Sequence, residues 1–200
     1  MPKSREEHLS DVDNVLAEVR EMLDLTRDTG DINELLALQM LLKVTKELHY
    51  IHNVADLITK VLDSSIAFVD GDRAFLMLME DGTPRFKMGR DKAANYLTRE
   101  DFSPSTGAIE EALSTQKTIL VPDAQMDENY SKRESVQGLS LRTIICSPML
   151  AKRQTIGLLY VDSSRSPLAH FTRAHINVLA SLADQSAVAI LNAQKFETHI

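Results

Sequence analysis

Two apolar segments joined by a short charged turn constrain the fold of this chain more than any other feature of its sequence. They are Thr143–Leu150 and Thr155–Asp162, and only Ala151–Gln154 separates them. Consecutive strands joined by so tight a turn pair in antiparallel fashion. The second segment is apolar on both faces, because Ile156, Leu158 and Tyr160 alternate with Gly157, Leu159 and Val161. A sheet with two apolar faces needs a covering layer on each side.

Further strands are predicted on the N-terminal side of this pair. Arg73–Glu80 is a compact apolar run, Asp81–Gly82 is a turn signal, and Arg85–Met88 alternates polar and apolar residues. This order predicts a second β-hairpin. Thr118–Val121 is a short β-branched run ended by Pro122, which predicts one more strand.

Helical patterns lie before, between and after these strands. Asp31 and Glu34 have the spacing of a capping box, so a helix is expected to begin there, and Asn53 is a plausible cap where that helix restarts. Ser105 can cap a short helix that reaches residue 113. Thr172 can cap a long helix that continues to the end of the chain. Helices before and after the strands in the sequence can cover one face of an antiparallel sheet, which indicates an α+β fold.

Residues 1–30 form an N-terminal segment distinct from the domain expected over residues 31–200. Its apolar residues follow the alternating three- and four-residue spacing of one helix face: Leu9, Val12, Leu16, Val19 and Leu23. Two interpretations remain open. The stripe can pack on its own domain, or it can form the seam of a dimer.

Charge and motif content exclude several functional classes. The net charge of −7 argues against nucleic acid and against anionic membranes as partners. The N-terminus lacks the apolar region of a signal peptide, so a cytoplasmic location is expected. Hydrolase, zinc-protease and phosphate-loop motifs are missing, which predicts no catalytic residues. His49 and His52 are the only histidines close together, and no further ligand pattern accompanies them, so no metal site is predicted.

Five segments, in order and over roughly four-fifths of the chain, resemble the GAF domain family. They are DRAFLMLMEDG, STGAIEEAL, TILVPDAQMDENY, the pair SVQGLSLRTIICSPML and TIGLLYVDSS, and FTRAHINVLASLADQSAVAILNAQKF. The resemblance implies a central antiparallel sheet of about six strands. Terminal helices would cover one face, and loops with a short helix would form a ligand pocket on the other.

The resemblance also implies a role in bacterial signal transduction. A small ligand would change the packing of the terminal helices in a homodimer, and the signal would reach an output domain or partner protein outside this chain. The expected dimer contacts are the stripe of residues 1–30 together with Ile176, Leu179, Ala183 and Ile190. A structural dimerisation module without ligand is the alternative. A free methionine sulfoxide reductase is a weaker one, since the single cysteine, Cys146, has no resolving partner.

The candidate pocket residues are taken from the first hairpin, the short helix, the crossover loop and the central strand. They are Met77, Phe86, Met88, Thr106, Gly107, Ala108, Asp123, Ala124, Asp127, Tyr130, Ser135, Val136 and Thr143. Structural explanations are open as well: Asp123 can cap a turn, and the methionines are often core. Ser105, next to these candidates, can cap its own helix in place of binding a ligand.

No cofactor is assigned. Of the pattern that cyclic-nucleotide-binding relatives carry near the last strand and helix, only Phe171 is present, which leaves a cyclic nucleotide possible but poorly supported. Bilin and haem are not expected, because Cys146 lies inside a strand and Ser147 follows it where a histidine often accompanies bilin attachment.

Overall fold

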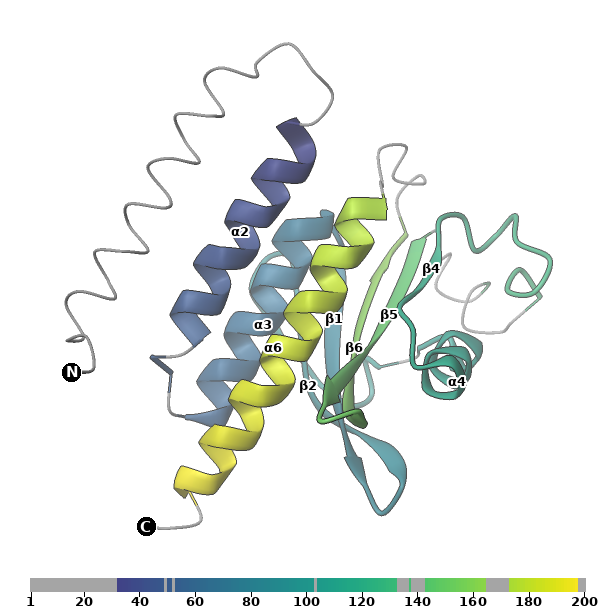
Figure 1. Cartoon of the computed structure of the whole chain (residues 1–200). Helices are drawn as coiled ribbons and strands as arrows, with labels where there is room; N and C mark the ends of the chain where they lie inside the picture. The colour runs from purple at the N-terminus through teal and green to yellow at the C-terminus, as the bar shows by residue number, and fades with distance from the viewer. Residues whose placement is uncertain are drawn as a thin grey trace, which may run out of the picture.

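The computed structural model describes residues 32–48, 50–51, 53–102, 104–132, 137, 143–164 and 173–197. A single six-stranded antiparallel sheet forms the centre, in the order β3-β2-β1-β6-β5-β4. Helices α2, α3 and α6 lie on one face and α4 on the other (Figure 1). The elements are α2 (Ile32–Leu48), α3 (Val54–Val69), β1 (Arg73–Glu80), β2 (Thr83–Asp91), β3 (Tyr96–Leu97), α4 (Thr106–Thr115), β4 (Ile119–Val121), β5 (Thr143–Ala151), β6 (Gln154–Ser163) and α6 (Arg173–Glu197). The predicted α+β fold is confirmed.

Helix α3 begins where the sequence predicts. The Asn53 side chain accepts a hydrogen bond from the backbone N–H of Asp56 at 3.0 Å, so the predicted cap is confirmed. The helix ends before Asp70, which adopts a left-handed conformation with φ 49°. Its inner face, with Leu57, Val61 and Leu62 fully buried, lies against the sheet.

The sheet separates two apolar cores. The helix-face core contains alternate residues of the strands and the inner residues of the helices, including Ala74, Leu76, Leu78, Ile145, Leu159, Val161, Leu62, Leu179 and Ala183. The α4-face core contains Phe75, Met77, Ile144, Cys146, Leu158 and Tyr160 from the strands, with Ala108, Ala112, Val121, Ala124 and Tyr130. Strand alternation therefore supplies both cores, as the two apolar faces of the sequence require.

Two β-bulges place some strand residues on the opposite face of the sheet from the one that simple alternation predicts. Met77 pairs with Phe86 and Leu76 with Met88, so Lys87 is the extra residue of β2. Phe86 therefore contacts the α4-face core, whereas Met88 packs against the helix-face core. In β6 the extra residue is Ile156, which packs on the helix face and not with Leu158 and Tyr160 as predicted.

Helix α6 is long and apolar enough to span a membrane, and its inner face is buried in the helix-face core. The apolar stretch is Ile176–Lys195, with mean hydropathy 1.2. Three of the predicted dimer contacts on this helix, Leu179, Ala183 and Ile190, are 0% exposed in the helix-face core. That prediction is wrong for these three residues, because a helix packed on a sheet needs the same spacing as a dimer seam. Ile176 is half-buried, and Leu9 to Leu23 lie outside the described residues.

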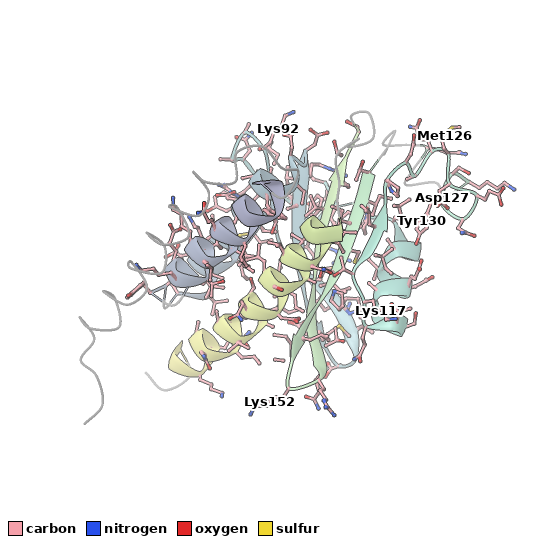
Figure 2. The ribbon with its side chains drawn as sticks, turned by 45° about the horizontal axis from the view of Figure 1, so that its top comes forward. Lys92, Lys117, Met126, Asp127, Tyr130 and Lys152 are labelled. Carbon is pink, nitrogen blue, oxygen red and sulfur yellow. The ribbon has the colours of Figure 1, made fainter. Side chains whose placement is uncertain are left out.

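The β5–β6 turn is built from residues poorly suited to it. Ala151 pairs with Gln154, so Lys152 and Arg153 alone connect the strands, and their φ values are 50° and 66°. A two-residue turn with positive φ at both positions normally contains Asn-Gly, because the Cβ of most other L-residues costs about 1–2 kcal/mol in this region. Lys152 lies at the tip of this hairpin (Figure 2).

We expect the double substitution Lys152→Asn/Arg153→Gly to stabilise the fold by about 1–2 kcal/mol, since it relieves both left-handed positions. Urea denaturation of the two proteins measures the difference. The control is Lys152→Ala/Arg153→Ala, which removes the same charges and retains Cβ. An equal gain in this control would show that charge, and not backbone strain, limits the turn.

Candidate functional site

Aromatic side chains fill the centre of the α4 face. Phe102, from the loop before α4, packs on Phe75 of β1 with ring centroids 4.7 Å apart and on Phe86 of β2 at 5.4 Å. Its ring meets that of Tyr160 of β6 at 6.2 Å and 85°, an edge-to-face arrangement. The middle of this face is therefore closed by the protein's own side chains.

A hollow of about 350 Å³ lies beside this aromatic cluster. It is formed by β1 and β2, the loop before α4, and the first turns of α4. Its lining residues are Met77, Pro84, Phe86, Arg99, Phe102, Pro104, Thr106, Ile109 and Glu110. We call it the α4 hollow. An apolar floor with a few polar groups at the margin is the usual composition of a small-molecule site.

Buried polar groups mark the start of α4, next to the aromatic cluster. The backbone N–H of Ser105 donates to the Tyr160 hydroxyl at 3.1 Å, and both residues are fully buried. The Ser105 side chain makes no capping hydrogen bond, and its Oγ has no partner among the described residues. Burial raises the pKa of Tyr160 well above its usual value, so the phenol stays neutral. Because the Ser105 side chain does not hydrogen-bond to the start of α4, the predicted self-capping by Ser105 is wrong.

An ion pair fixes the loop that walls the hollow. Arg73 Nε and Nη2 donate to the two carboxylate oxygens of Asp162 at 2.9 and 2.6 Å, and Nη1 donates to the carbonyl of Asp101 at 3.1 Å. The Asp101 carboxylate accepts from the backbone N–H and hydroxyl of Thr98 at 2.7 and 2.9 Å. These bonds to Thr98 hold the pKa of Asp101 below its usual value. The wall of the hollow is thus anchored to β1 and β6.

The crossover loop uses its polar residues mainly for its own folding. The carbonyl of Asp123 accepts from the backbone N–H groups of Met126 and Asp127, and the Asp127 side chain accepts from Asn129 N–H at 2.8 Å. Tyr130 donates its hydroxyl to Glu111 of α4 at 2.5 Å. Figure 2 shows Asp127 and Tyr130 on the side of the sheet that bears α4. The loop is therefore tied to the helix that borders the hollow.

The structure brings together only part of the predicted pocket. Met77, Phe86 and Thr106 line the α4 hollow, whereas Gly107, Ala108, Ala124 and Tyr130 are buried in the core beneath α4. Met88 lies on the opposite face, so its prediction is wrong. The Thr143 hydroxyl donates to the carbonyl of Pro122 at 3.2 Å and is used within the fold. Ser135 and Val136 lie outside the described residues.

Sequence reasoning missed the loop before α4 and the outer face of that helix. Arg99, Phe102 and Pro104 come from a stretch without helical or strand periodicity, so nothing in their spacing indicates a common site. Ile109 and Glu110 lie within the predicted short helix. That they line one hollow together with residues of β2 depends on tertiary packing, which the sequence pattern does not show.

Cys146 is inert in this fold. It is fully buried in β5, and burial raises the pKa of its thiol far above the usual value, so the reactive thiolate is not populated. Within the part of the chain that the structure describes, no group of three or more His, Cys, Asp or Glu side chains is placed to hold a metal ion. His49 and His52 lie outside the described residues.

A six-stranded antiparallel sheet with α2, α3 and α6 on one face, and a hollow beside the short helix α4 on the other, defines the α+β class of this domain. A family model described as GAF domain matches residues 53–190, and the chain therefore belongs to the GAF domain family. Members of this family are generally regulatory rather than catalytic.

Solved GAF domains of bacterial signalling proteins share this fold. The GAF domain of a phosphoenolpyruvate-protein phosphotransferase from Coxiella burnetii has a TM-score of 0.65 at 16% identity, covering 85% of this chain and 99% of that one. The corresponding Acinetobacter domain has a TM-score of 0.62 at 14% identity, covering 80% and 95%. The GAF domain of a two-component sensor histidine kinase from Bacillus halodurans has a TM-score of 0.54 at 19% identity, covering 74% and 99%. Sequence identities this low establish a shared fold and nothing further. A comparison with curated proteins gave no match.

Proposed function

We propose that this chain is a non-catalytic sensor module in which a small molecule bound in the α4 hollow alters the packing of the helical layer. The observation that supports it is the hollow itself, with its apolar floor on the face of the sheet opposite α3 and α6. The inert thiol of Cys146 argues against the sulfoxide reductase alternative.

Strand β2 offers a route from the hollow to the helices. Phe86 lines the hollow, and after the bulge at Lys87 the strand turns Met88 toward α3, where the Thr59 hydroxyl donates to its sulfur at 3.3 Å. Arg90, at the end of the same strand, binds the Asp63 carboxylate of α3 through Nε and Nη2 at 2.8 and 2.9 Å. A ligand that shifts one end of β2 would thus act directly on α3.

A dimer is the form in which such a shift would reach a partner protein. On α2, Leu38 and Leu42 are one turn apart and are 45% and 42% exposed. The apolar stripe of residues 1–30 precedes them in the sequence. These residues would supply the contact between two copies, in place of the buried residues of α6. A dimerisation module without ligand is the competing function, and it would use the same surface.

We expect Thr106→Trp to abolish ligand binding, because Thr106 is exposed, lines the hollow, and can be enlarged without disturbing the core. Native mass spectrometry of freshly purified protein should show a retained small molecule in the natural protein and none in the variant. A ligand at about one hundred times its Kd should stabilise the natural protein by about 2.7 kcal/mol and leave the variant unchanged.

The matched control is Ser114→Trp, which adds the same side chain to an exposed position of α4 that does not line the hollow. It should bind as the natural protein does. If no molecule is retained and no metabolite raises the melting temperature, while light scattering shows a dimer, the chain is a dimerisation module and the sensor proposal fails.

A further inference from the structure

The margin of the α4 hollow carries two opposite charges that do not pair. The Arg99 guanidinium comes from the loop before α4, and the Glu110 carboxylate comes from the second turn of the helix; both line the hollow. Neither has an ion-pair partner among the described residues, and they do not bridge to each other. Glu100 is near enough to Arg99 for a weak electrostatic interaction, but the two side chains form no ion pair.

Apart from these two charged residues and Thr106, the hollow is lined by apolar residues. Met77, Phe86, Phe102 and Ile109 form its floor, and two prolines complete it. Both charged side chains are exposed, so a ligand that contacted only this floor would leave them to solvent and would gain nothing from their charges. A ligand with several negative charges would meet one cation and one carboxylate of like sign, which costs affinity.

We propose that the α4 hollow recognises a small amphipathic zwitterion, with the chemistry of an apolar α-amino acid. Its carboxylate would bind the Arg99 guanidinium, for which bidentate contact is the favoured geometry. Its ammonium would bind the Glu110 carboxylate, and its side chain would lie on the floor beside Phe102. This inference rests on the proposed function, since it names the ligand class for the same site.

The test compares a zwitterion with analogues that lack one charge. L-Phenylalanine and L-leucine are titrated calorimetrically into the full chain, and so are 3-phenylpropionate, which lacks the amine, and phenethylamine, which lacks the carboxylate. Both amino acids should bind, and each single-charge analogue should bind at least about tenfold more weakly than phenylalanine, the usual loss for one charged hydrogen bond.

Two variants assign each charge to its residue. Arg99→Gln should weaken phenylalanine binding about tenfold and leave it no tighter than phenethylamine. Glu110→Gln should leave phenylalanine no tighter than 3-phenylpropionate. Arg85→Gln and Glu128→Gln are the controls, because they change exposed charges of the same kinds that do not line the hollow; both should bind phenylalanine as the natural protein does.

The outcomes separate this inference from the function on which it rests. If neither amino acid binds, or if both variants retain the preference for phenylalanine over its analogues, the zwitterion inference is overturned. A different molecule retained by the natural protein and lost from Thr106→Trp would then leave the sensor function standing. If nothing is retained and no probe binds, both proposals fail.

Discussion

The Arg73→Met variant is expected to lose about 3 kcal/mol of stability at pH 7, because it leaves the Asp162 carboxylate buried without its counter-ion. Asp162 is 2% exposed, and Arg73 supplies both hydrogen bonds to its carboxylate. Thermal unfolding at pH 7 measures the loss, which corresponds to a fall of about 6–12 °C in Tm for a chain of this size. The variant also removes the donor that holds the Asp101 carbonyl.

The loss should depend on pH with a definite sign. Burial already raises the pKa of Asp162 in spite of the hydrogen bonds and charge of Arg73, which lower it. Without Arg73 the folded-state pKa rises further above the unfolded value of about 3.9. The folded variant then binds a proton that the unfolded chain releases, so its stability falls as pH rises above about 4. The difference from the natural protein should therefore be largest near pH 7 and shrink toward pH 4.

A second substitution and a surface pair check this explanation. Asp162→Asn introduced into Arg73→Met removes the buried charge and should recover most of the pH-dependent loss. Lys87→Met breaks the exposed pair between Lys87 and Glu80 and should cost less than about 1 kcal/mol. A pH-independent loss in Arg73→Met would show that packing of the arginine side chain, and not the buried charge, accounts for its effect.

Gly157→Ala should also destabilise the fold by about 3 kcal/mol, the upper range for overpacking. Gly157 lies in β6 between Leu78 and Met149 of the neighbouring strands. A Cβ at this position would lie 2.4 Å from the backbone carbonyl oxygen of Met77. The clash is with main chain, so it is relieved only by separating β1 from β6. Urea denaturation measures the loss.

Gly82→Ala is the matched control for this substitution. Gly82 has a φ of 76° in the β1–β2 turn, and a Cβ there would meet nothing within 4 Å. Its cost is confined to the left-handed backbone conformation, about 1–2 kcal/mol. Equal losses in the two variants would mean that the sheet adapts around residue 157 and that steric contact does not explain its glycine.

The candidate site was harder to predict than the strands that support it. Phe86 and Met88 are two residues apart, and alternation places them on one face. The bulge at Lys87 places them on opposite faces, one toward the hollow and one toward α3. A bulge depends on how two paired strands twist together, so the sequence of β2 alone does not reveal it.

The loop before α4 illustrates the same limit. Phe102 joins the aromatic cluster, and Arg99 lies at the margin of the hollow, yet neither belongs to a periodic pattern. The same loop is tied to β1 by the bond from Arg73 to the Asp101 carbonyl. That bond joins segments distant in sequence.

The sequence alone determined the two apolar faces of Thr143–Leu150 and Thr155–Asp162, and with them a sheet covered on both sides. Local patterns suffice for this because side-chain alternation and turn chemistry act between neighbouring residues. The tertiary structure decided which layer each face meets: Leu179 and Ile190 of α6 on one side, and the residues around α4 on the other. Apolar spacing predicts only that one face of a helix is buried. Which surface covers that face depends on the tertiary structure.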